Sequence, residues 1–195
     1  MPSSPSPPSS SPPRIVLVGA PGAGKGTQGP VLAERLGVVY LATGDVLRSE
    51  VACDSGLGRR VAVYLDGGEL VPDDLIVDVV VDRLAPDAGY VLDGFPRTVA
   101  QADTAEQRVP GGLTHAVVFL TLPDDVARGR LAQRDQGRSD DADPSTIEHR
   151  LRVFHAETEP LLDWYRARGV LHAVDATHPP EAVLAAIESA LAIRA

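Results

Sequence analysis

The chain is 195 residues long, which suits one globular domain, and 44% of its residues are hydrophobic, enough to form a core. Its formal net charge is −9, from 27 acidic and 18 basic residues, which argues against a general binder of nucleic acid or anionic membranes. The single cysteine, Cys53, rules out an internal disulfide. No apolar run approaches the roughly 20 residues of a membrane span, and the first residues lack the pattern of a signal peptide. We therefore expect a cytoplasmic protein in which any phosphate site is local.

Residues 1–13 contain only serine and proline after the first methionine. Such a composition cannot bury enough apolar area to offset the entropy lost on ordering. This segment is predicted to be a disordered tail, and a docking peptide in the polyproline conformation is the alternative. The folded domain is expected over residues 14–195.

Short apolar runs alternate with segments of helical pattern along the rest of the chain. The expected strands are 15–18, 38–41, 90–92, 115–120 and 170–174. The expected helices are 24–36 (ended by Gly37), 98–107, 123–134, 144–168 and 180–194, with short helices between 44 and 84. This alternation predicts an α/β fold in which a five-stranded parallel sheet carries helices on both faces. Ligands of such sheets bind at the carboxyl ends of the strands.

A glycine-rich loop at 19–27 follows the first expected strand and opens the first expected helix, which is the context of a P-loop. Its glycines let backbone N–H groups surround phosphate oxygens, and the helix N-terminus adds a positive partial charge. Lys25 is the one lysine among 18 cationic residues, which indicates that a compact ammonium is needed there. Gly26 replaces the Ser or Thr of the general motif, and Thr27 comes one position later. The loop predicts a site for nucleotide phosphates.

Five sequence strings occur along the chain in a fixed order. They are GAPGAGKGTQ at 19–28, TGDVLR at 43–48, GELVP at 68–72, DGFPRTVAQ at 93–101 and GRSDD at 137–141. In this order they resemble the adenylate kinases, a family of nucleoside monophosphate kinases, over nearly the whole chain after residue 13. The resemblance implies a P-loop kinase domain with an AMP-binding subdomain at 43–72 and a short lid at 134–143.

The resemblance implies that AMP is held by arginines at its phosphate and by a pocket at its base. Two forked guanidiniums, Arg48 and Arg97, suit a phosphate monoester, and the amide of Gln101 suits adenine because it both donates and accepts. Thr43 matches a second position that senses the base. The implied AMP-binding residues are Thr43, Arg48, Leu70, Val71, Gly94, Arg97, Gln101, Arg138 and Arg150.

On the donor side, the resemblance implies that Arg130 stacks on the adenine of ATP. The implied ATP-binding residues are Gly22, Ala23, Gly24, Lys25, Gly26, Thr27, Arg130 and Arg134. The implied catalytic residues are Lys25, Arg97, Arg134, Arg138 and Arg150. Asp140 and Asp141 are expected to hold the closed arrangement through ion pairs. The 5 histidines lie outside these motifs and are interpreted as structural or surface residues.

Magnesium is the implied cofactor. Asp93 closes the third expected strand and would organise the shell of Mg²⁺ through water, since this ion keeps several of its waters. Related kinases often carry another carboxylate at the end of the fourth strand. That position is taken here by Thr121 or Leu122, so fewer protein charges would hold the ion.

These features predict reversible transfer of the γ-phosphoryl group of ATP to AMP, giving two ADP, by in-line attack without a covalent intermediate or a protein base. The expected partners are ATP and AMP, without nucleic acid or membrane, and we expect a monomer. A UMP or CMP kinase is one alternative, although such relatives tend to have alanine at the position of Thr43 and asparagine at that of Gln101. A nucleotide sensor without catalysis is the other, although it could dispense with Arg134, Arg138 and Arg150.

Overall fold

A computed structural model of the chain describes residues 12–85, 87–133 and 144–192. It contains one five-stranded sheet in the order β2-β3-β1-β4-β5, and every neighbouring pair is parallel. The strands are β1 (Arg14–Gly19), β2 (Val39–Ala42), β3 (Tyr90–Asp93), β4 (Ala116–Thr121) and β5 (Leu171–Asp175). The predicted five-stranded parallel sheet is therefore confirmed: β2, β4 and β5 start one residue later than expected, β1 starts one residue earlier, and β3 starts where expected.

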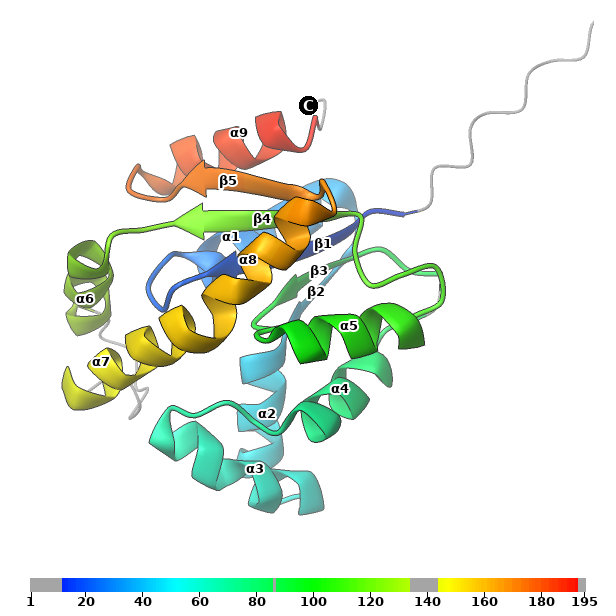
Figure 1. The fold of residues 1–195 in the computed structure, drawn as a ribbon, viewed down its shortest axis with the longest axis vertical. Helices are drawn as coiled ribbons and strands as arrows, with labels where there is room; N and C mark the ends of the chain where they lie inside the picture. Colours follow the sequence, from blue (N-terminus) through cyan, green and yellow to red (C-terminus); the bar gives the residue numbers. More distant parts are fainter. Residues whose placement is uncertain (1–11, 86, 134–143, 193–195) are drawn as a thin grey trace, which may run out of the picture.

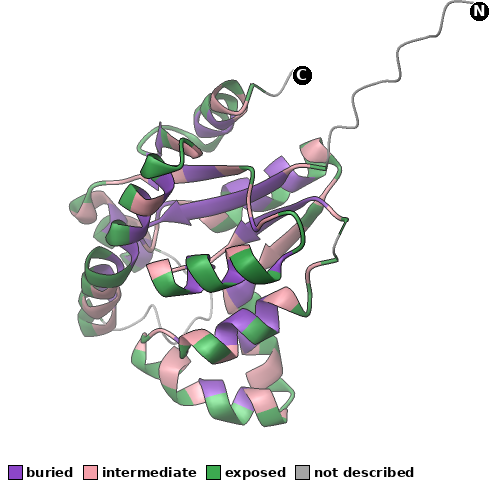
Figure 2. Cartoon of the chain, turned by 45° about the vertical axis from the view of Figure 1, so that its right-hand side comes forward, coloured by how far each residue is buried: buried purple, intermediate pink, exposed green. Residues whose placement is uncertain are grey.

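The central strand β1 is buried along its whole length because both of its faces are covered. Its side chains alternate between two cores: Val16 and Val18 belong to one, and Ile15 and Leu17 to the other. Figure 2 shows the buried strands between layers of helices whose outer surfaces are exposed. A continuous apolar run rather than an alternating one is what a strand in this position requires.

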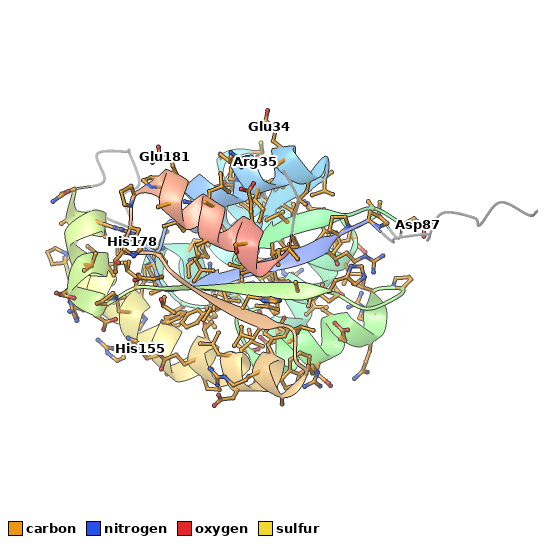
Figure 3. All side chains as sticks on the ribbon, turned by 90° about the horizontal axis from the view of Figure 1, so that it is seen from above. Glu34, Arg35, Asp87, His155, His178 and Glu181 are labelled. Atoms are coloured by element: carbon orange, nitrogen blue, oxygen red, sulfur yellow. The ribbon has the colours of Figure 1, made fainter. Side chains whose placement is uncertain are left out.

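Helices cover both faces of the sheet, as the alternation predicted (Figures 1 and 3). The pair α1 and α9 lies on one face, and α5, α7 and α8 lie on the other. The bounds of these helices are α1 (Lys25–Leu36), α5 (Val99–Arg108), α7 (Pro144–Val153), α8 (Glu159–Ala167) and α9 (Pro180–Ala190). The helix α6 (Asp124–Ala132) follows β4 and packs against α7. Gly37 ends α1 with a φ of 65°, as expected of a glycine at that position.

The segment between β2 and β3 forms a group of short helices beside the sheet (Figure 1). They are α2 (Thr43–Ala52), α3 (Gly56–Gly67) and α4 (Asp73–Val81). Ser55 caps α3 by accepting a hydrogen bond from the backbone N–H of Gly58 at 2.8 Å. A Cβ at Gly58 would lie 2.0 Å from the backbone oxygen of Glu50, so α2 and α3 approach each other through this glycine.

The segment predicted as one helix over 144–168 is interrupted. A five-residue π-helical turn, Phe154–Thr158, separates α7 from α8. Pro160 follows this turn and has no N–H to donate to the carbonyl four residues earlier, and the N–H of Glu159 bonds instead to the carbonyl of Phe154. Phe154 and Thr158 are buried and reach the pocket described below.

The carboxyl ends of all five strands lie along one edge of the sheet because the strands are parallel. The segments that leave this edge include the glycine-rich loop after β1, Thr43 after β2 and residues 94–97 after β3. Within the described ranges, no helix has both the length and the apolar character that a membrane crossing requires.

Candidate active site at the carboxyl edge of the sheet

The glycine-rich loop between β1 and α1 is shaped by two positions whose backbone conformation only glycine adopts easily. Gly22 has a φ of 83° and Gly24 a φ of 92°, both in the left-handed region. The carbonyl of Gly24 accepts bonds from the N–H groups of Thr27 and Gln28, each at 2.9 Å, and these bonds begin α1. The loop therefore presents a helix N-terminus at the edge of the sheet, where an anion is stabilised.

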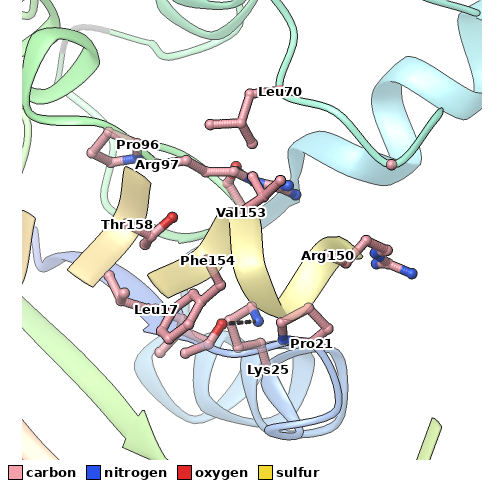
Figure 4. A pocket seen from close by; sticks show the side chains of 14 residues that line it. Leu17, Pro21, Lys25, Leu70, Pro96, Arg97, Arg150, Val153, Phe154 and Thr158 are labelled. Carbon is pink, nitrogen blue, oxygen red and sulfur yellow. Dashed lines mark hydrogen bonds between the residues drawn. The ribbon is translucent and has the colours of Figure 1, made fainter. Parts of the chain in front are cut away.

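Lys25 bends back over the loop from which it starts. Its Nζ donates to the backbone oxygen of Gly19 at 2.6 Å and to that of Ala20 at 3.1 Å. Figure 4 shows the ammonium in a pocket that is also lined by Arg97, from the loop after β3, and by Arg150, from α7. We call this space, of about 560 Å³, the central pocket. Its lining also includes Leu17, Val18, Gly19, Pro21, Gly68, Leu70, Gly94, Pro96, Val153, Phe154 and Thr158.

The arginines around the central pocket raise its positive potential. Burial is the largest of the effects that lower the pKa of Arg97, and the charge of Arg150 is the next, with Arg48 adding to it. The carboxylate of Asp93 acts in the opposite direction. Cations that lower the pKa of Arg97 favour the entry of an anion into the pocket, because the anion relieves the repulsion between the positive charges.

A second space, the side pocket, adjoins the loop on the side of β2 and α2. It measures about 600 Å³ and is lined by Lys25, Arg48, Asp93, Gly94 and Arg150, together with Gly22, Gly24, Gly26 and residues of 40–45. Arg48 is ion-paired with Asp45 one turn earlier on α2. Lys25 and Arg150 line both pockets, so one cationic surface continues from the central pocket to the side pocket.

Asp93 lies where β3 ends, next to the end of β2. Its Oδ2 accepts a hydrogen bond from the hydroxyl of Tyr40 at 2.9 Å, and its backbone oxygen accepts one from Thr43 Oγ1 at 3.1 Å. The sheet register pairs Asp93 with Ala42, which brings these side chains together. The carboxylate is thereby held in the side pocket beside the cations.

A smaller space, the apolar chamber, opens between α2, α3, α4 and α5. Its polar lining consists of Glu69, Arg97 and Gln101, and its apolar lining of Leu47, Leu65, Leu70, Val71 and Ile76. Gln101 is 2% exposed, so its amide is enclosed where it borders the chamber. Apolar walls with a few fixed polar groups are typical of a site for a flat organic ring.

Thr43 and Gly94 form the wall between Asp93 and Arg97. Gly94 has a φ of 81°, and a Cβ there would lie 2.8 Å from Thr43 Oγ1 and 3.3 Å from a guanidinium nitrogen of Arg97. The Nε of Arg97 donates to the carbonyl of Gly94 at 2.9 Å. Thr43 is 3% exposed with its hydroxyl on Asp93, so its expected contact with a base stays a prediction.

An open space of about 1010 Å³, the outer pocket, lies on the other side of the loop. It is lined by Gly22, Ala23, Gly24, Thr27, Gln28, Arg130 and Leu131, and by residues 176–180 and Val183. Arg130 extends from α6 and donates to the backbone oxygen of Ala176 at 2.8 Å. His178, labelled in Figure 3, belongs to this lining, although the sequence assigned it no functional place.

The structure thus distributes the predicted residues over connected spaces. Lys25, Arg97 and Arg150 share the central pocket, Arg48 and Asp93 lie in the side pocket, and Arg130 lies in the outer pocket. Arg134, Arg138, Asp140 and Asp141, and with them the predicted lid, lie outside the described residues. The sequence reasoning missed Tyr40, Asp73 and the segment after β5; for that segment alone a signal existed, since it leaves the carboxyl edge of the sheet.

A parallel sheet with a phosphate loop after its central strand, and with cations gathered in front of that loop, defines the class of P-loop nucleotide kinases. The family model for adenylate kinase matches residues 17–170. The chain is 46% identical to the adenylate kinase of Synechococcus sp. (strain JA-2-3B'a(2-13)), over 88% of this chain and 92% of that protein. It is 43% identical to the adenylate kinase of Thermobifida fusca, over 93% and 100% of the two chains, and 43% identical to that of Thermus thermophilus, over 92% and 97%. The chain belongs to the adenylate kinase family.

Proposed function

We propose that this chain catalyses the reversible transfer of the γ-phosphoryl group of ATP to AMP, giving two ADP. The observation that carries the proposal is the placement of Lys25, Arg97 and Arg150 around one pocket, between the phosphate loop and the apolar chamber. Two nucleotides bound on opposite sides of this pocket would bring their phosphates together there. The relatives over nearly the whole chain are adenylate kinases, which supports the same reaction.

ATP is proposed to bind with its phosphates in the glycine-rich loop and its adenosine in the outer pocket. The loop offers backbone N–H groups and the positive end of α1, and Lys25 adds a point charge within reach of the β- and γ-phosphates. Arg130 would face the adenine, since its guanidinium is fixed at the rim of the outer pocket by the carbonyl of Ala176. A planar guanidinium stacks well on a ring.

AMP is proposed to bind through residues of the segment 43–72 and of the loop and helix after β3. Arg48, Arg97 and Arg150 would hold its phosphate, while Leu70, Val71 and Gln101 would enclose its base in the apolar chamber. Guanidiniums bind phosphates through paired charge-assisted hydrogen bonds, which also fix the direction of the attacking oxygen. The roles predicted for Arg134 and Arg138 rest on the sequence alone.

The chemistry asks the protein for positioning and charge, because a phosphate oxygen of AMP is itself the nucleophile. That oxygen attacks the γ-phosphorus in line, and the β–γ bridging oxygen of ATP takes the electrons of the broken bond. Lys25 and the arginines neutralise charge on the transferred group and on the leaving ADP. The apolar lining, which includes Phe154 and Val153, keeps water away from the reacting phosphorus.

Magnesium fits the side pocket by the chemistry of its lining. Asp93 supplies a carboxylate oriented by Tyr40 close to Lys25, and carboxylate oxygen is the ligand type that this ion prefers. Gly26 brings no hydroxyl, and the hydroxyl of Thr121 is bonded to the carbonyl of Val174 at 3.2 Å, so we propose that Asp93 holds Mg²⁺ through water. When bound, the ion neutralises the phosphates of ATP. Asp93→Asn is expected to raise the Mg²⁺ concentration needed for half-maximal turnover by about tenfold, while an unchanged requirement would contradict this role.

The proposed reaction is tested by presenting ATP with AMP, UMP, CMP or GMP and measuring ADP formation. AMP should be used with a kcat/KM at least about 10² times that of the other acceptors, because their bases pair poorly with a fixed amide. Faster turnover with UMP or CMP would show a pyrimidine nucleotide kinase. Binding of ATP without turnover of any acceptor would show a nucleotide sensor.

A further inference from the structure

Gln101, the side chain that borders the apolar chamber, is held at both ends of its amide. Its Oε1 accepts a hydrogen bond from the backbone N–H of Arg97 at 2.7 Å. Its Nε2 donates to Oδ1 of Asp73, in the first turn of α4, at 2.8 Å. The residue belongs to α5, so the second bond joins two helices across the wall of the chamber.

These two partners permit only one orientation of the amide. A backbone N–H can only donate, and a carboxylate can only accept. Turning the amide over would put its NH₂ against the N–H of Arg97 and its oxygen against the carboxylate of Asp73. Either mismatch leaves polar groups of the buried Gln101 amide without partners, which is costly in an enclosed site.

Asp73 is itself fixed by a third residue. Thr98 Oγ1 donates to Asp73 Oδ2 at 3.3 Å and accepts from the backbone N–H of Gln101 at 3.1 Å. Thr98 is the N-cap of α5, so the residue that begins this helix also holds the carboxylate of Asp73 in place. Asp73, Thr98 and Gln101 form a closed set of hydrogen bonds, and the amide cannot rotate without breaking it.

We propose that Asp73 is a positioning residue that makes the site select a 6-aminopurine over a 6-oxopurine. The inference rests on the proposed function and adds to it a residue that need not touch the nucleotide. Each of the two bonds to Gln101 uses one bonding position, so Oε1 keeps a lone pair and Nε2 keeps an N–H. Adenine offers an acceptor at N1 and a donor at N6, whereas a 6-oxopurine offers a donor at N1 and an acceptor at O6.

The order of donor and acceptor on Gln101 therefore decides which base is accepted. With Oε1 fixed beside Arg97 and Nε2 fixed beside Asp73, the amide matches one purine pattern and opposes the other. Without Asp73, the amide could turn over at a smaller cost and adapt to the wrong base. A fixed polar group discriminates by leaving the wrong ligand unpaired, which is the stronger form of selectivity.

The experiment compares AMP with IMP as acceptors, because these differ only where the amide would meet the base. Asp73→Ala is expected to lower the ratio of kcat/KM for AMP to that for IMP by about tenfold or more, the amount expected from one lost hydrogen bond in an enclosed site. The change should come from the KM for AMP, with kcat altered by less than about threefold. Asp73→Asn keeps a carbonyl but adds an NH₂, and should lower the ratio by about threefold.

Asp74 provides the matched control, since it carries the same charge in the same turn of α4 and is exposed. Asp74→Ala removes the same interaction with the helix N-terminus and should leave the ratio within about twofold. Thermal unfolding of each variant shows whether it is folded, and Asp73→Asn replaces Asp73→Ala if the alanine variant is not.

An unchanged AMP-to-IMP ratio in a folded, active Asp73 variant would overturn this inference, even if both KM values rose together, because that result describes a structural residue. If Asp74→Ala lowered the AMP-to-IMP ratio as strongly as Asp73→Ala does, the inference would be overturned as well. Absence of AMP turnover in the wild-type chain would instead overturn the proposed function and this inference together.

Discussion

The two sides of the central pocket are held in place by different kinds of interaction. On the side of the glycine-rich loop, the backbone does most of the positioning: Gly22 and Gly24 set the curve of the loop, and Lys25 is held by two backbone carbonyls. All of these groups lie within a few residues of one another. The backbone angles and hydrogen bonds that shape the loop are therefore local.

On the side of the apolar chamber, side chains position other side chains. Asp73 fixes Gln101, Thr98 fixes Asp73, and Gly94 leaves room for Thr43 and Arg97. The partners come from different strands and helices, so this half of the site exists only when the fold is complete. Binding of the donor's phosphates in the loop should therefore tolerate distant changes, whereas acceptor binding should respond to them.

The largest expected effect on activity comes from a substitution in the glycine-rich loop. Lys25→Arg should lower kcat by about 10³-fold, because a forked guanidinium cannot occupy the space between the two carbonyls and reach the phosphates as the ammonium does. Steady-state assays with saturating ATP and AMP measure the loss, and the melting temperature should stay within about 2 °C of wild type.

Arg35→Lys serves as the control for this variant, since Arg35 is an exposed cation near the other end of α1, paired with Glu188 at 2.5 Å. Its activity should remain close to that of the wild-type chain. Near-normal turnover of Lys25→Arg would contradict the role given to the lone lysine.

The next effect addresses the acceptor side. Arg97→Lys should lower kcat/KM for AMP by about 10²-fold, since a lysine keeps the charge but loses the paired hydrogen bonds and the bond from Nε to Gly94. The KM for ATP should change by less than about threefold. Arg59→Lys, at an exposed position on α3, is the control for the substitution. An equal rise in the KM for ATP would show that Arg97 does not separate the two nucleotides.

The same contrast explains how much of the site could be predicted from the sequence. The loop with Lys25 is contiguous, so its residues, its place after a buried strand and the glycine that ends α1 were all visible. Asp73 and Tyr40 were not, because each acts through a side-chain bond to a residue 28 or 53 positions away. No periodicity in the sequence indicates such a long-range pairing of side chains.

The fold shows the same division. Alternation of apolar runs and helical segments predicted the parallel sheet, whereas the strand order depends on long-range pairing that no local pattern encodes. The π-helical turn before Pro160 was missed although a signal was present. A proline well inside a predicted helix removes one backbone hydrogen bond, and the extra residue of the turn accommodates that loss.

A third prediction concerns the packing beneath the acceptor side. Gly58→Ala would place a Cβ 2.0 Å from the backbone oxygen of Glu50, so α2 and α3 must move apart. The free energy of unfolding should fall by about 2 kcal/mol or more, measured by chemical denaturation. Because α2 carries Arg48, the KM for AMP should rise while the KM for ATP stays nearly constant.

Gly56 offers a matched control on the same helix. A Cβ at Gly56 would meet no heavy atom of the described residues within 4 Å. Gly56→Ala should therefore be neutral or slightly stabilising, by up to about 1 kcal/mol, because alanine favours a helix more than glycine does. Equal stability of the two variants would show that α2 and α3 do not depend on the close approach at Gly58.

The smallest effect is the pH dependence of a contact between the π-helical turn and α6. His155, labelled in Figure 3, belongs to the π-helical turn. Its Nδ1 lies 2.9 Å from Glu159 and its Nε2 lies 3.1 Å from Asp124 on α6. The hydrogen bond with Glu159, and after it that with Asp124, raises the pKa of His155 above its ordinary value of 6.5. The folded state thus favours the protonated ring, whose contribution is complete below about pH 6.5 and is lost as the pH rises through the raised pKa.

His155→Gln should therefore lower the melting temperature more at about pH 6 than at about pH 9, where the difference from wild type should approach zero. The ring is 41% exposed, so solvent screening limits the effect at pH 6 to about 2 °C. In a Glu159→Gln background the same substitution should cost less at pH 6, because the strongest partner of the charged ring is gone. A cost that grew with pH would mean that the neutral ring is the stabilised form, and α6 would then be joined to the π-helical turn by packing rather than by charge.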